Sequence, residues 1–322
     1  MNRIRRITAT AAAALLALSL TGAARAEIKA ETREERGRVM QVVWKDENGI
    51  PAPGPEGYAE VRYDYAYQQV TERYYDGEGN PFETAGGYYG KTVIRDSRNF
   101  ITSVEYLGVN GKLTMTRMGY AMISYPSYFT FGAERVVVFC GTNRRPVMVP
   151  SLGYAQVENE YKGTTLTGRT YKDEKGNPVD IPAGYAMMKK KMSKTSKILR
   201  VWYTHADGTP ATGPDGWYMC VYERDSKDRV TAVRYLDETE QPTEKGGCAW
   251  EEYVYNRDGT VTLTRFGLQG NRIPFENGAV SVRRTIKKDR ITTETYLGEN
   301  GEETATISYK YDQDGNLIEV IR

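Results

Sequence analysis

Residues 171–178 read YKDEKGNP, a phrase that places an aromatic residue, an acidic residue, a glycine and a proline at fixed spacing. The phrase recurs as WKDENGIP (44–51), YYDGEGNP (74–81) and YTHADGTP (203–210), with weaker copies YLGVNGKL (106–113), FCGTNRRP (139–146), YLDETEQP (235–242), FGLQGNRIP (266–274) and YLGENGEE (296–303). The first residue is aromatic in all nine copies, and each copy follows the last after 30–33 residues. So regular a period indicates a tandem repeat.

Each repeat also contains two strand-like segments. A second glycine opens the first of them, as in GYAEVRYDY (57–65), and a tight turn such as NRDG (256–259) or DQDG (312–315) follows it. Asn or Asp close to Gly is typical of hairpin turns. The second segment is rich in Val, Thr and Ile, as in RVTAVRYL (229–236), and it leads to the next aromatic residue. Each repeat is therefore predicted to be a pair of antiparallel strands.

The alternation of side chains predicts which face of each strand is packed. Counted from the second glycine, positions +2, +4 and +6 are mainly apolar, as in Ala59, Val61 and Tyr63. The positions between them carry residues such as Glu60 and Arg62, so that face is predicted to be mostly solvated. In the third repeat, the proline at position 126 is expected to interrupt the strand.

The predicted fold class is all-β, with about nine two-stranded antiparallel units stacked as an elongated hairpin ladder or solenoid. A single unit cannot bury its apolar face, whereas stacked neighbours bury a continuous stripe. Residues 39–322 form the predicted repeat domain, and residues 27–38 are a polar lead-in or cap. Closure of the units into a β-propeller-like ring is the alternative.

The first 26 residues have the three parts of a secretory signal peptide. A positive stretch with Arg3, Arg5 and Arg6 precedes a short apolar run, and residues 24–26 read ARA, a cleavage site of the A-x-A type. The sequence therefore predicts cleavage after residue 26, no transmembrane anchor afterwards, and a periplasmic, secreted or cell-surface location. The chain holds 44 basic and 42 acidic residues; the signal carries four of the arginines and no acid, so the remainder has 40 against 42, a net charge of −2. A nearly neutral chain is not expected to bind nucleic acid.

Two groups of phrases resemble known bacterial repeats. YVYNRDGTVTLTRF (253–266) and YKYDQDGNLIEV (309–320) resemble the Tyr-Asp repeats of Rhs-type shell proteins. The consensus YLDxxGxP is similar to the aromatic-Gly repeats of cell-wall-binding proteins, including choline-binding and clostridial toxin repeats. The first resemblance implies a structural shell, and the second implies recognition of a cell-wall glycan.

Two sets of residues are candidates for partner binding. The first set comprises rings that recur at fixed spacing, which could serve as platforms for sugar rings or could stack on one another as the core. These anchor aromatics are Trp44, Tyr74, Tyr106, Tyr171, Tyr203, Tyr235 and Tyr296. The second set is a run of lysines that could contact an anionic surface or form a solvated hairpin tip. These are Lys189, Lys190, Lys191, Lys194 and Lys197.

The sequence predicts no catalytic site, no cofactor and no metal site. The single histidine, His205, occupies a turn position, and the three cysteines do not have the spacing of metal ligands. Cys220 is at position +4 and Cys248 at position +1, each counted from the second glycine of its own repeat. One position is even and the other odd, which predicts opposite faces of the sheet and argues against a disulfide between them.

The leading prediction is a noncatalytic scaffold outside the cytoplasm that binds a cell-wall glycan, another glycan or an envelope protein along an extended face. A structural role of the Rhs shell type is one alternative. A hydrolase or enzyme accessory that uses paired carboxylates is the other.

Overall fold

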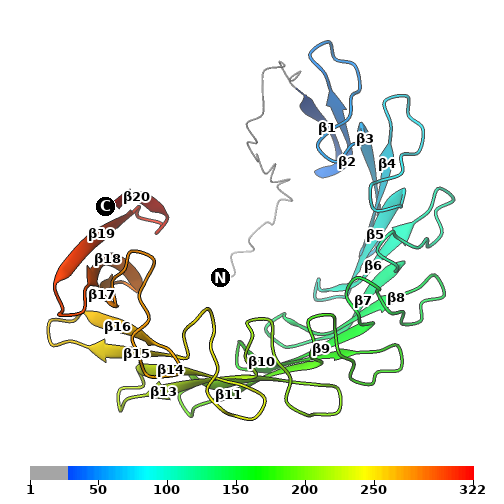
Figure 1. The fold of residues 1–322 in the computed structure, drawn as a ribbon. Coiled ribbons are helices and arrows are strands. Elements are labelled where there is room, and N and C mark those ends of the chain that lie inside the picture. Colours follow the sequence, from blue (N-terminus) through cyan, green and yellow to red (C-terminus); the bar gives the residue numbers. More distant parts are fainter. Residues whose placement is uncertain (1–27) are drawn as a thin grey trace, which may run out of the picture.

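The computed structural model describes residues 28–322 as one open antiparallel sheet in which every strand pairs with its neighbours in sequence (Figure 1). The predicted signal peptide lies outside the described residues. The strands are β1 (Lys29–Glu35), β2 (Arg38–Lys45), β3 (Glu60–Ala66), β4 (Gln69–Tyr75), β5 (Gly90–Arg95), β6 (Ile101–Leu107), β7 (Met122–Tyr128), β8 (Glu134–Cys140), β9 (Gln156–Lys162), β10 (Thr165–Lys172), β11 (Met187–Met192), β12 (Ile198–Thr204), β13 (Met219–Arg224), β14 (Val230–Leu236), β15 (Trp250–Tyr255), β16 (Val261–Phe266), β17 (Ser281–Lys287), β18 (Arg290–Leu297), β19 (Glu303–Tyr311) and β20 (Leu317–Ile321).

The sheet follows an open arc with β1 at one end and β20 at the other (Figure 1). The all-β hairpin ladder is confirmed, and the propeller-like closure is wrong because the described strands leave the sheet unclosed. The lead-in predicted over residues 27–38 contributes β1, which pairs with β2 over its whole length. The described strands therefore make ten hairpins, from β1–β2 to β19–β20.

The same type of turn is found in the hairpin turns and in the loops that join successive hairpins. In the loop after β4, the carboxylate of Asp76 accepts bonds from the backbone N–H groups of Glu78 and Asn80, and Gly79 adopts a positive φ of 86°. The side chain of Asn80 also donates to this carboxylate and lowers the pKa of Asp76. The hairpin turn after β13 is built in the same way, with Asp225 accepting from the backbone of Lys227 and Arg229. The Asp-x-x-Gly phrase thus fixes turn geometry.

The apolar core is a row of stacked rings along the sheet. From Trp44 to Tyr235, each anchor ring contacts a ring at position +1 after a second glycine, so the two sets alternate. Tyr74, for example, lies 4.6 Å from Tyr58 and 6.1 Å from Tyr88 between ring centroids. The ring row comprises Trp44, Tyr58, Tyr74, Tyr88, Tyr106, Tyr120, Phe139, Tyr154, Tyr171, Tyr185, Tyr203, Trp217 and Tyr235. Offset and edge-on ring pairs of this kind stabilise beyond their buried area.

The loops that join successive hairpins cover the ring row; we call them the covering loops. A Cβ built on Gly54 would lie 2.6 Å from the ring of Trp44, and one on Gly213 would lie 2.3 Å from the ring of Tyr203. Glycine is required at both places because the backbone of the loop lies directly against the ring. The face that carries the ring row is called the core face below.

The ring row ends where the repeat changes its spacing. In the eighth repeat, Arg265 occupies the place on the core face where the other repeats have the anchor ring. Phe266 is the next residue along β16, so its side chain lies on the opposite face, where it stacks on Trp250. The +1 position of the preceding loop is Cys248. Arg265 contacts the ring of Phe275 at 4.2 Å instead, and Phe275 then contacts Tyr296.

Two details of the repeats differ from the sequence predictions. Pro126 does not interrupt its strand; β7 continues past it through a bulge between Ser124 and Ser127. Cys248 lies in the same buried cluster as Cys220, because position +1 precedes the strand and does not obey its alternation. All three cysteines are nevertheless free.

The opposite face is less solvated than predicted. Glu60 retains only 8% of its exposure, and it accepts bonds from Arg62 and Gln41. Glu105 is buried in the same way beneath Arg144, with 3.1 Å between Nη2 and Oε2. Charged partners make such burial tolerable.

Candidate functional site

An apolar hollow opens on the core face near the hairpin turns of β13 to β18. Its volume is about 290 Å³, close to the lower limit for ligand sites. We call it the tyrosine hollow. Its walls are formed by Tyr222, Val230, Val233, Tyr253, Tyr255, Val261, Leu263, Arg284, Ile286 and Ile291.

Strand register explains why these side chains meet. Tyr253 lies opposite Leu263, and Leu263 lies opposite Val282 on the next strand, so their side chains share the core face. The residues come from three successive hairpins, and the antiparallel pairing aligns them in rows. The hollow therefore belongs to the stack of hairpins and to no single repeat.

Polar groups stand at the margins of the hollow. The hydroxyl of Tyr253 donates to Glu251 at 2.6 Å, and the guanidinium of Arg284 donates to Glu294 at 2.8 Å. The guanidinium of Arg229 lies 4.0 Å from the ring centre of Tyr255. The carboxylates of Glu251 and Glu294 are thus already bonded. Apart from Arg284, the lining side chains of the hollow are aliphatic or aromatic.

Burial changes the acidity of several groups on the core face. Desolvation raises the pKa of Tyr222 and of Tyr253, and it raises the pKa of the Cys220 thiol to about 11. It also raises the pKa of Tyr63 and of Tyr128 to about 12. These groups stay protonated at neutral pH, so the hollow presents neutral phenols.

These shifts predict a loss of stability in alkali. Unfolded tyrosine titrates near pH 10, whereas Tyr63 and Tyr128 keep their protons until about pH 12 in the folded chain. Unfolding therefore releases protons in this window, so stability is fully present below about pH 10 and falls as the pH rises toward 12. Urea unfolding combined with phenolate absorbance measures this effect. Titration of all tyrosines near pH 10 with the circular dichroism unchanged would contradict it.

The anchor aromatics pack edge-on or tilted against rings that are not themselves anchors, such as Tyr58, Tyr88 and Tyr185. Tyr74, Tyr203 and Tyr235 are buried, and Trp44, Tyr106, Tyr171 and Tyr296 are partly buried. All of them except Tyr296 belong to the ring row, and Tyr296 contacts Phe275. Six of these seven rings thus lie within the packed ring row.

The lysine run does not gather into one patch. Lys189 pairs with Trp202 and Lys191 with Arg200, whereas Lys190 pairs with Val201 on the core face. The alternation of β11 thus divides the three between the two faces. Lys194 and Lys197 lie in the turn that follows.

His205 links two covering loops. Its Nδ1 lies 2.7 Å from the carboxylate of Asp180, which also accepts the backbone N–H of Ala206. The contact joins successive repeats, as a structural turn residue would. Among residues 28–322, no group of three or more His, Cys, Asp or Glu side chains is arranged to hold a metal ion. The same residues contain no helix long and apolar enough to span a membrane.

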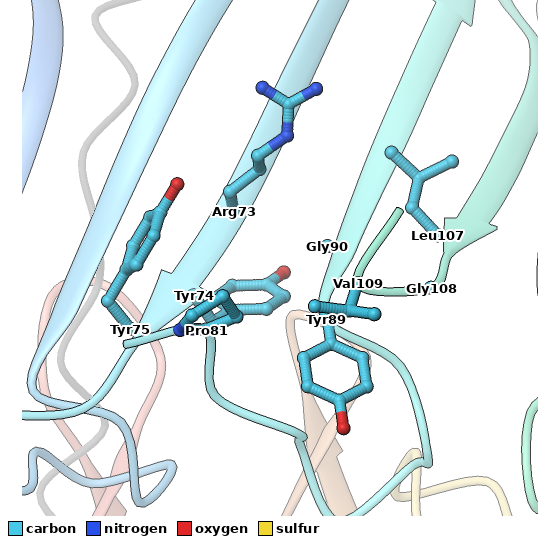
Figure 2. A pocket seen from close by; sticks show the side chains of 9 residues that line it. All are labelled: Arg73, Tyr74, Tyr75, Pro81, Tyr89, Gly90, Leu107, Gly108 and Val109. Atoms are coloured by element: carbon cyan, nitrogen blue, oxygen red, sulfur yellow. The ribbon is translucent and has the colours of Figure 1, made fainter. Parts of the chain in front are cut away.

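A second, smaller pocket lies at the covering-loop end of β4 to β6 (Figure 2). Its volume is about 50 Å³, which suits a few water molecules and not an organic ligand. Gly90 borders this pocket. The position requires glycine, because a Cβ there would lie 2.4 Å from the carbonyl oxygen of Glu72. Figure 2 shows Arg73, Tyr75 and Tyr89 around it.

The sequence did not point to the tyrosine hollow. A readable signal was present in the tyrosines of the first strand, since Tyr253 and Tyr255 occupy the +6 and +8 positions. The phrase at residues 266–274 also has a spacing that differs by one residue from the other copies. The sequence did not show that this difference turns Phe266 away from the core face.

No family model and no curated protein matches the chain. Among solved structures it is similar to a chain of the crystal structure of TcdB2-TccC3, with 11% identity and a TM-score of 0.23, over 88% of this chain and 18% of that chain. A structure of the Photorhabdus luminescens Tc holotoxin pore with a mutated TccC3 matches at 10% identity and a TM-score of 0.20, over 88% and 17%. The chain spans less than a fifth of the length of either of these chains.

Proposed function

We propose that the chain is a noncatalytic scaffold outside the cytoplasm that binds a partner along the core face of its sheet. The observation that carries this proposal is the tyrosine hollow, an apolar depression of about 290 Å³. Apolar depressions with a few polar groups at their margins are typical binding sites.

An envelope protein is the partner that these walls favour. Val233, Val261 and Leu263 offer the aliphatic contact that an apolar side chain of a protein requires. A glycan would be expected to stack on open ring faces, yet anchor rings such as Tyr74 and Tyr203 are packed against the +1 rings Tyr58 and Tyr185. Glu251 and Glu294 already bond to Tyr253 and Arg284, which supports a noncatalytic role.

Retention experiments with a matched pair of variants test this proposal. Ile286 lines the hollow and is 44% exposed, whereas Val254 lies on the opposite face of β15 and is 58% exposed. Immobilised protein is incubated with envelope extract, peptidoglycan and soluble glycans. We expect Ile286→Asp to lower retention of the envelope protein about tenfold or more, because docking would bury an unpaired charge. Val254→Asp should bind like the original chain.

The outcomes are distinct. Retention of peptidoglycan or glycan alone would replace the protein partner by a polymer, and equal binding by both variants would move the site away from the hollow. No retention of any fraction would contradict the binding proposal and favour a structural, shell-like role.

A further inference from the structure

The two edges of the sheet differ in chemistry. The last strand, β20, reads LIEVI; all five residues are exposed, and four of them are large and apolar. The first strand, β1, reads KAETREE and is exposed throughout, with charged residues in most positions. Charges on an edge strand discourage indiscriminate pairing, whereas an exposed apolar edge is a template for another strand.

The core face is also uncovered at the β20 end. Between β16 and β17 the covering loop runs over residues 267–280, but between β18 and β19 only residues 298–302 remain. No loop of the usual length therefore lies over Tyr296 and Ile307. An open hollow of about 480 Å³ is found there, and it extends to Arg322.

From this asymmetry we infer that the protein associates head to tail, with β20 of one copy pairing with β1 of a second copy. This interface goes beyond the proposed partner binding and does not depend on it. Within the described sheet, β1 pairs with β2 and β20 with β19, and no other strand reaches either of them. The pairing would add a strand to the apolar edge and extend the core face across the junction.

Strand direction permits this pairing. Every neighbouring pair in the sheet is antiparallel, so odd-numbered strands run one way and even-numbered strands the other. A β1 strand placed beside β20 with its core face on the same side therefore continues the alternation. Thr32 lies opposite Val42, on the core face, and Val320 lies opposite Tyr309. Both residues can thus meet on the core side of the junction.

Charge favours β1 over a second β20 as the occupant. When Val320 faces Thr32 of the second copy, Glu319 faces Arg33 of that copy. A two-fold pairing of β20 with itself about its middle residue would instead place Glu319 against Glu319. Like charges directly opposite on paired strands are destabilising, and unlike charges are stabilising. Because a head-to-tail contact uses two different surfaces, it adds copies in series until a ring closes or a filament forms.

Cysteine cross-linking of the protein tests the register. Thr32→Cys and Val320→Cys are combined in one chain, and each is also made alone. The double variant should form a ladder of disulfide-linked dimers, trimers and longer species under mild oxidation, because opposed residues bring their Cβ atoms within disulfide range. The single variants and the original chain, whose three cysteines are buried, should remain monomeric on the same non-reducing gel.

Light scattering provides the second arm. The weight-average mass of the original chain should rise at least twofold with concentration. Ile318→Lys combined with Val320→Lys should keep the chain monomeric, while Val254→Lys, an exposed site away from both edges, should not. A Glu319→Cys variant that forms only dimers would overturn the head-to-tail pairing in favour of the two-fold one. Intramolecular bridging in the double variant, or a monomeric mass at every concentration, would overturn self-association.

Discussion

Replacing Tyr74 by alanine is expected to lower the free energy of unfolding by about 3–5 kcal/mol, the range for losing a buried aromatic side chain. Only 3% of Tyr74 is exposed, and its ring is packed between Tyr58 and Tyr88. The substitution leaves a cavity in the row that the covering loop cannot fill. Its hydroxyl also donates to Glu72 at 2.8 Å, and that bond is lost.

A tyrosine in the same hairpin provides the control. Tyr67 lies in the turn between β3 and β4 and is 87% exposed, so Tyr67→Ala should change stability by no more than about 0.5 kcal/mol. Tyr74→Phe keeps the ring and should cost about 1 kcal/mol for the hydrogen bond. Urea unfolding measures the totals, and hydrogen exchange locates the loss in β3 to β6. Equal effects of the two alanine variants would show that the ring row does not hold this region together.

Replacing Gly213 by alanine is the second change with a large expected effect. The added Cβ would lie 2.3 Å from the Tyr203 ring, which is held on both sides by Tyr185 and Trp217. Since the ring cannot move without disturbing its neighbours, we expect a cost of about 1–3 kcal/mol, as for other overpacked cores. The near-ultraviolet circular dichroism should weaken as the ring is displaced.

A double-mutant cycle identifies the cause. Tyr203→Leu removes the ring, so Gly213→Ala should lower the free energy of unfolding much less in that background. The two changes should therefore show a coupling energy of about 0.5–3 kcal/mol. Gly208 offers a matched control, because a Cβ there meets nothing within 4 Å and only its positive φ of 89° is at issue. Additive effects of Gly213→Ala and Tyr203→Leu would contradict a clash with the ring.

Local chemistry made most of the fold predictable. The recurring Asp-x-x-Gly turns mark where strands end, and Val- and Thr-rich segments such as residues 229–236 mark the strands between them. The alternation within strands correctly placed Val61 and Tyr63 on the packed face, because their side chains follow the pleat. Because each strand pairs only with the strands before and after it in the sequence, the sheet has one free edge at β1 and another at β20.

The parts that could not be predicted lie where the pleat does not apply. Tyr58 and Cys248 precede their strands, so their side chains turn to the core face against the parity rule. At Arg265 and Phe266, a change of one residue in spacing exchanges which of the two faces the core. The tyrosine hollow depends on three hairpins in register, and this information is present in no single repeat.

Pairing restricted to sequence neighbours has a mechanical consequence. Pulled from its two termini, the chain carries load through hairpins in series, and the outermost hairpin can unzip without disturbing those at the centre. A repeat of about 32 residues released in this way would lengthen the tether by roughly 100 Å. Such a molecule would extend under force in regular steps, one hairpin at a time. It would refold quickly when the force is removed, because the contacts between hairpins are local in sequence.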